Sequence, residues 1–151
     1  MGEQDTEASV IEVPVVDGPS VEVPLIVVDA ANVVGSVPDG WWRDRAGANR
    51  RLRDALAPLA ATGLDAAGSP GWARRPPLEV VLVVEGAARQ VTGTDTVRVV
   101  AATGSGDDAI VEVVRTEGTG RPCAVITADR GLRERVTVLG ATVLGPRTVR
   151  S

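Results

Sequence analysis

Residues 25–36 read LIVVDAANVVGS. The first four are apolar and mostly β-branched, and Asp29 follows them directly. An unbroken apolar run of this kind is typical of a strand that is buried on both faces of a parallel sheet. Asp29 is therefore expected at the carboxyl end of that strand, where open α/β sheets place their ligands. Asn32 follows three residues later, close enough to share a site with Asp29.

Outward from this strand, apolar runs alternate with segments of helical character. Strands are predicted at residues 78–84, 97–101, 122–127 and 141–144, and helices from about Asp44, from about Asp107 and from 130 to 139. Such alternation indicates right-handed crossovers between parallel strands, with helices on both faces. The predicted fold is α/β, a three-layer α/β/α sandwich with a mostly parallel sheet of about five strands.

The helix that begins near Asp44 has an apolar and a basic side. We expect it to end or kink at Pro58, because proline cannot donate the backbone hydrogen bond of a helix interior. Its expected buried stripe, at helical spacing, is Leu52, Ala55, Leu56 and Leu59. Its exposed side carries the one concentrated basic group in the sequence, Arg43, Arg45, Arg50, Arg51 and Arg53.

The sequence indicates one domain, residues 24–151, preceded by an N-terminal arm or edge hairpin at residues 1–23. In the arm, IEVP at 11–14 recurs as VEVP at 21–24. Neither proline can donate to a sheet ladder, so the arm is expected outside the main sheet. A β-rich arm is also a natural dimer element, which makes a homodimer an expected assembly.

The beginning of the sequence is acidic and lacks the basic and apolar segments of a secretory signal. No run of about eighteen apolar residues is present, so no membrane span is predicted. The expected location is the cytoplasm.

The composition excludes several kinds of site. There is no histidine, which excludes histidine-based triads and histidine–metal sites, and the single cysteine, Cys123, excludes a cysteine-rich zinc site. Cys123 follows Pro122 in an apolar run and is expected in the core. The formal net charge of −4 argues against a wholly basic nucleic-acid coat, although a local basic face would be enough to bind RNA.

Acidic residues fall where the predicted strands end. Asp29, Glu85 and Asp129 follow three strands, and Asp107 and Asp108 open the helix after a fourth. In a parallel sheet all of them reach the same edge. Carboxylates held this close repel one another unless a cation compensates, and Mg²⁺ or Mn²⁺ prefers oxygen ligands. The pattern therefore predicts a metal site that can activate a water against a phosphate.

Each carboxylate also has a purely structural interpretation. Asp29 and Asp129 would serve as caps of turns or helices, and the acidic pair at 107–108 suits a first helical turn. Ser105 is a candidate N-cap, with Asp108 at the capping-box position.

Three motifs in order resemble the PIN-like nuclease domains, particularly their NYN branch. They are DAAN at 29–32, GDDAI at 106–110 and ITAD at 126–129, and the similarity covers about residues 24–144. The resemblance implies a metal-dependent ribonuclease that hydrolyses phosphodiester bonds. It implies catalytic roles for Asp29, Asn32, Asp107, Asp108 and Asp129.

Within that set, Asp29, Asp108 and Asp129 are the expected ligands of Mg²⁺ or Mn²⁺, and Asp107 and Asp108 remain alternatives for one ligand position. Thr127 is expected as a supporting hydroxyl and Glu85 as an additional carboxylate. The chain departs from the family pattern at residues 30–31, where two alanines replace the usual glycine and aromatic residue.

The expected substrate contacts are Arg43, Arg45, Arg50, Arg130 and Trp41. Arginines would bind the phosphates of RNA, and the tryptophan would stack on an unpaired base. The structural alternatives are a solvated arginine surface and a tryptophan that covers the core. Two other functions stay open, namely a nucleotide or small-phosphate phosphohydrolase and a non-catalytic RNA-binding or interaction module.

Overall fold

The computed structural model describes residues 22–150 and contains one five-stranded sheet in which every strand is parallel to its neighbours. The order of strands across the sheet is β4-β3-β2-β5-β6. The strands are β2 (Leu25–Asp29), β3 (Glu79–Val84), β4 (Val97–Ala101), β5 (Cys123–Ile126) and β6 (Thr142–Leu144). All but the last two residues of the predicted N-terminal arm, residues 1–23, lie outside the described part.

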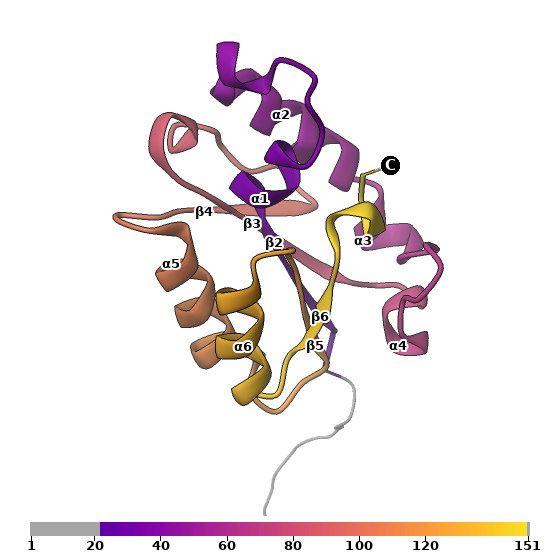
Figure 1. The fold of residues 1–151 in the computed structure, drawn as a ribbon. Coiled ribbons are helices and arrows are strands. Elements are labelled where there is room, and N and C mark those ends of the chain that lie inside the picture. The colour runs from indigo at the N-terminus through magenta and orange to yellow at the C-terminus, as the bar shows by residue number, and fades with distance from the viewer. Residues whose placement is uncertain (1–21, 151) are drawn as a thin grey trace, which may run out of the picture.

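Helices connect the strands and cover both faces of the sheet (Figure 1). The α-helices are α1 (Ala30–Gly35), α2 (Arg45–Leu56), α3 (Leu59–Thr62), α4 (Gly71–Arg74), α5 (Gly106–Val113) and α6 (Arg130–Val138). Shorter turns of helix are η4 (Trp41–Arg43), η5 (Gly86–Ala88), the π-helical η6 (Val114–Gly118) and η7 (Pro146–Thr148). In residues 22–150, no helix is long and apolar enough to cross a membrane.

Two hydrophobic clusters, one on each face of the sheet, form the core. Ile26 and Val28 of β2 pack into the cluster that contains α1, α2 and α4. Leu25 and Val27, which point the other way, pack against α5 and α6. This alternation explains why the apolar run is unbroken, because both faces of β2 are buried. The predicted three-layer α/β/α sandwich is confirmed.

The chain changes direction across the sheet at β2. From β2 it proceeds through β3 to β4 at one edge, and then crosses back through α5 to β5 on the other side of β2. The carboxyl ends of β2 and β5 therefore flank a topological switch point, the place where open parallel sheets form ligand crevices.

The predicted buried stripe of α2 is wrong in part. Ala55 is exposed, and Leu59 lies beyond the end of α2. The buried positions are instead spaced by four residues, at Ala48, Leu52 and Leu56. Leu52 and Leu56 are buried as predicted, and α2 ends before Pro58, so that Leu59 is not part of its face. Residues 63–77, between α3 and β3, contain the short helix α4.

Candidate active site

Asp29 is the buried centre of the acidic edge. Its side chain is 4% exposed, and it ends β2 while capping α1. The backbone N–H of Asn32 donates to its Oδ1 over 3.3 Å. The hydroxyl of Thr127 donates to its Oδ2 over 2.8 Å. Asp29 is thus fixed by one bond from its own helix and one from the neighbouring strand end.

Thr127 and Asn32 connect the ends of β2 and β5. The Oγ1 atom of Thr127 also accepts a hydrogen bond of 3.0 Å from the backbone N–H of Asp129. The Oδ1 atom of Asn32 accepts one of 2.8 Å from the backbone N–H of Ala128. Thr127 therefore has the supporting position that was predicted for it, whereas the side chain of Asn32 orients the loop after β5 rather than Asp29.

Asp129 stands next to this network and begins α6. Its Oδ1 accepts from the backbone N–H of Leu132 over 2.9 Å, which makes it the N-cap of that helix. The structural interpretation of Asp29 and Asp129 as caps is therefore confirmed. A cap requires only an acceptor oxygen, which asparagine, serine or threonine supplies equally well. Capping alone does not account for two negative charges at one edge of the sheet.

The acidic side chains influence one another. Burial raises the pKa of Asp29, the hydrogen bonds from Thr127 and Asn32 oppose this rise, and repulsion from Asp107 and Glu85 adds to it. The pKa of Asp107 is raised by its own burial and then by repulsion from Asp129 and Glu85. The edge therefore carries more negative charge than its surroundings compensate.

The adjacent residues Asp107 and Asp108 have different surroundings. Asp108 is 75% exposed, and its carboxylate forms an ion pair of 3.1 Å with Arg135 of α6. Its backbone N–H donates to Ser105 Oγ, which confirms Ser105 as the N-cap of α5. Asp107 is half-buried, and its charge acts on Asp29. Of the pair, Asp107 rather than Asp108 contributes to the buried acidic edge.

Glu85 reaches the same edge from the end of β3. A Cβ atom added to Gly106, the first residue of α5, would lie 2.4 Å from Glu85 Oε2. The glycine of the GDDAI motif therefore lets the helix start approach this carboxylate closely. This role of Gly106 was not predicted, although a glycine directly before two acidic residues was a visible signal.

The donor set suits a hard divalent cation, but the spacing limits how it binds. The available atoms are carboxylate oxygens, which Mg²⁺ and Mn²⁺ prefer. Within residues 22–150, no three acidic or cysteine side chains are close enough to hold one metal ion together. Mg²⁺ commonly binds through one or two carboxylates and keeps several waters or substrate oxygens. The arrangement fits an ion of this second type.

The predicted substrate contacts divide into three environments. The Arg45 guanidinium lies 4.9 Å from the centre of the Trp41 ring, and the Arg43 guanidinium lies 5.6 Å from the Trp42 ring. Arg50 and Arg130 are exposed and have no ion pair within residues 22–150. Trp41 is half-buried and packs against the core, as the structural alternative required.

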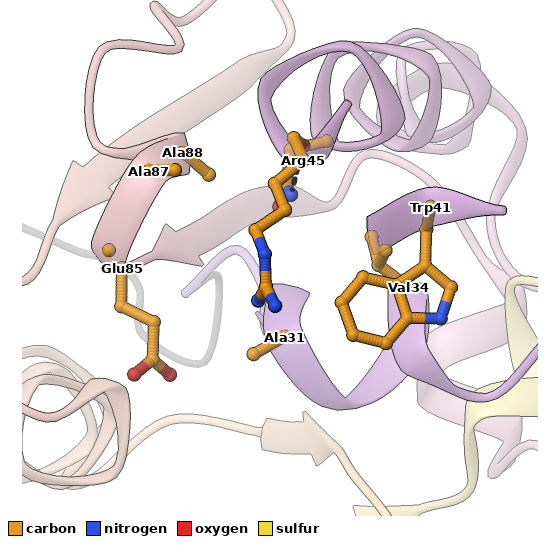
Figure 2. Close-up of a pocket in the computed structure, with 9 residues that line it drawn as sticks. Ala31, Val34, Trp41, Arg45, Glu85, Ala87 and Ala88 are labelled. Carbon is orange, nitrogen blue, oxygen red and sulfur yellow. Dashed lines mark hydrogen bonds between the residues drawn. The ribbon is translucent and has the colours of Figure 1, made fainter. Parts of the chain in front are cut away.

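Trp41, Arg45 and Glu85 share a pocket of about 220 Å³ beside the acidic edge. Figure 2 shows the Arg45 side chain reaching between Glu85 on one side and Trp41 on the other. Asn49 of α2 also lines this pocket, and it was not among the predicted site residues. The signal that could have identified it is a polar residue at helical spacing with Leu52 and Leu56.

The chain matches no known family model and no curated protein. Among solved structures it is similar to Rae1 (YacP) from Bacillus subtilis, with a TM-score of 0.59 and 17% sequence identity. The similarity covers 84% of this chain and 72% of that one. At this identity the likeness shows a shared fold, and it supports the resemblance to PIN-like domains at that level.

Proposed function

We propose that this chain is a metal-dependent ribonuclease whose reaction centre comprises Asp29, Asp107 and Asp129. The observation that carries the proposal is the convergence of three acidic side chains from β2, α5 and the end of β5. Burial raises the pKa of Asp29 and Asp107, and repulsion from neighbouring acidic side chains of the edge raises both further. They also lie at the topological switch point of a parallel sheet, where ligands bind.

The residues of the edge have complementary roles in this proposal. Asp29 and Asp107 would hold Mg²⁺ or Mn²⁺, and Asp129 would reach it through a water. When bound, the cation supplies an activated water and neutralises charge that develops on the phosphate. The 2.8 Å hydrogen bond from Thr127 to Oδ2 orients Asp29 and opposes the rise in its pKa that burial causes.

Donors for the RNA backbone surround the acidic side chains. The Oδ1 atom of Asn32 is engaged by Ala128, whereas its Nδ2 group has no partner within residues 22–150 and is free to donate to a phosphate oxygen. Arg130 follows Asp129 directly and is exposed, and Arg45 stands at the neighbouring pocket. These cations and the unpaired amide favour a polyanionic substrate.

The test is calorimetric titration of Mn²⁺ into the protein, with cleavage of a mixed RNA pool followed in the same samples. We expect the wild type to bind Mn²⁺ and to cleave. Asp29→Asn and Asp107→Asn should abolish binding and lower cleavage at least a hundredfold, because loss of a direct ligand should exceed the effect of a supporting residue.

Two matched variants serve as controls. Asp108→Asn alters the neighbouring carboxylate, which is paired with Arg135, and Asp65→Asn alters an exposed carboxylate on the loop after α3. Both should retain binding and cleavage. Absence of Mn²⁺ binding to the wild type, with or without RNA, would overturn the proposal. Loss of binding in Asp108→Asn but not in Asp107→Asn would instead assign the ligand position to Asp108.

A further inference from the structure

The pocket beside the acidic edge contains a buried polar atom without a partner. Asn49 is 5% exposed, and its Nδ2 group donates to the backbone oxygen of Arg45 over 2.8 Å. This bond fixes the orientation of the amide, because the reversed orientation would place two oxygens together. The Oδ1 atom is then left buried and without a hydrogen-bond partner in the described part of the chain.

An unpartnered buried acceptor costs free energy, so its position calls for an explanation. Asn49 lines the pocket together with Trp41, Arg45 and Glu85. A ligand that brings an N–H donor into the pocket would satisfy Oδ1. Leucine or alanine at this position would fill the face of α2 without that cost, which argues that the amide serves a ligand.

One wall of the pocket suits a flat ring. Trp41 is held against the core, and the Arg45 guanidinium lies over its ring at 4.9 Å. Aromatic rings and guanidinium planes are the surfaces on which proteins stack unpaired bases. The pocket volume of about 220 Å³ lies below the roughly 300 Å³ at which pockets for drug-sized ligands begin, which suits a single base.

The pocket also adjoins the proposed reaction centre. Glu85 lines it, and the same carboxylate is close enough to Asp29 and Asp107 to raise their pKa. Ala31, another lining residue, belongs to the helix that Asp29 caps. A base in the pocket would therefore belong to a nucleotide next to the phosphate at the acidic edge.

We propose that this pocket binds one unpaired nucleobase of the RNA. Asn49 Oδ1 accepts a hydrogen bond from an N–H group of the base, and Trp41 and Arg45 form the surface on which the ring of the base stacks. The inference rests on the proposed ribonuclease function and names a specificity subsite for it. All four bases carry an N–H donor, so the pocket is expected to require a base without demanding a particular one.

The test is metal-free binding of the four ribonucleoside 5′-monophosphates, measured by titration calorimetry in the presence of EDTA. Ribose 5-phosphate is the base-free probe. We expect the nucleotides to bind at least tenfold more tightly than ribose 5-phosphate, because stacking and the bond to Asn49 both need the base. Equal affinity for ribose 5-phosphate, or no binding of any nucleotide, would overturn the inference.

Variants identify the residues. Asn49→Leu should weaken nucleotide binding about tenfold while the protein stays at least as stable, because leucine removes the unpartnered oxygen. Trp41→Ala should weaken binding at least tenfold, and Trp41→Phe should restore most of it because the stacking face remains. Trp42→Ala is the matched control, since this exposed ring does not line the pocket. Unchanged affinity in Asn49→Leu and Trp41→Ala would overturn the assignment.

The design separates this inference from the proposed function. The binding measurements contain no metal and no cleavage step, so they do not depend on nuclease activity. Base binding without Mn²⁺-dependent cleavage would keep the pocket and remove the ribonuclease proposal. The opposite result is also possible: the protein binds no mononucleotide, and Asn49→Leu and Trp41→Ala leave RNA cleavage unchanged. That result would support the ribonuclease proposal and overturn the inference of a base-binding pocket.

Discussion

Asp29 combines a supporting role with an electrostatic cost. Its two carboxylate oxygens accept hydrogen bonds from Asn32 and Thr127, yet burial and acidic neighbours raise its pKa. A buried, negatively charged group that is only partly compensated is a common feature of functional sites, where stability is given up for activity.

The raised pKa of Asp29 predicts how the free energy of unfolding depends on pH when no metal is present. As the pH rises from the ordinary aspartate pKa of 3.8 through the raised pKa of Asp29, the folded protein holds a proton that the unfolded chain has lost. The ionisation of Asp29 therefore lowers the free energy of unfolding across this range. Asp29→Asn lacks the ionisation, so its stability relative to wild type should increase with pH and then level off.

At pH 7 the gain in Asp29→Asn should be on the order of 1 kcal/mol, measured by urea unfolding in EDTA. Asp29→Ala is the contrast, because it also removes the cap of α1 and should lose about 1 kcal/mol relative to the asparagine variant. A difference between wild type and Asp29→Asn that stays constant from pH 4 to pH 8 would contradict the assignment.

The side chain of Thr127 connects the end of β5 to the end of β2 by hydrogen bonds. Its buried hydroxyl donates to Asp29 and accepts from the backbone of Asp129. Thr127→Val keeps the shape and removes both bonds, so the protein should lose roughly 2 kcal/mol of unfolding free energy. The pKa of Asp29 should also rise further, because the lost bond lowers it.

Thr127→Ser provides the control for that prediction. It retains the hydroxyl and loses only a buried methyl group, which is worth about 1 kcal/mol. NMR titration of the Asp29 carboxyl carbon should show a shift in Thr127→Val and little change in Thr127→Ser. Equal carboxyl pKa values in the two variants would show that the hydrogen bond does not matter.

At the scale of elements, a glycine lets two short helices meet. Gly63 ends α3 with φ 79° and ψ 171°, and a Cβ atom there would lie 2.4 Å from the backbone oxygen of Arg74 in α4. The next residue, Leu64, donates its N–H to the backbone oxygen of Ala73. Gly63→Ala therefore meets both an unfavourable backbone conformation and a collision with backbone that cannot move aside.

We expect Gly63→Ala to lower the free energy of unfolding by about 3 kcal/mol or more, measured by urea denaturation. Gly68→Ala is the matched variant, because Gly68 also has a positive φ of 89° but open space around it. It should cost only about 1 kcal/mol. Similar losses in the two variants would mean that the close approach to α4 contributes nothing.

At the scale of the whole molecule, the single cysteine reports on the integrity of the sheet. Cys123 begins β5, is 4% exposed, and burial raises its thiol pKa to about 11. Because the thiolate is the reactive form, native Cys123 should resist a disulfide reagent at pH 8. Labelling should follow opening of the sheet, and its rate should rise in parallel with the unfolded fraction as urea is added.

A rate of labelling in native buffer like that of a small exposed thiol would contradict this expectation. It would mean that β5 separates from β2 without global unfolding. Such opening would also release the bonds that Thr127 and Asn32 make across the strand ends, so Thr127→Val should then accelerate labelling far more than it lowers global stability.

Much of this protein follows from local sequence patterns. The apolar runs and the turns between them fixed five strands and the parallel, layered architecture, because a strand buried on both faces needs apolar residues at every position. The order of acidic residues relative to strand ends was enough to bring Asp29, Glu85 and Asp129 to one edge. The cap at Ser105 and the burial of Cys123 were also predicted.

Tertiary structure alone decided the finer points. Asp107 and Asp108 are adjacent in sequence, and only the packing of α6 against α5 pairs Asp108 with Arg135 and leaves Asp107 half-buried beside the charges of Asp129 and Glu85. Which residues of α2 are buried, and whether the side-chain oxygen of Asn49 has a hydrogen-bond partner, likewise depend on what the helix packs against. The physical reason is that a sequence pattern fixes periodicity and chain direction, whereas burial, charge pairing and hydrogen-bond satisfaction depend on neighbours that are distant along the chain.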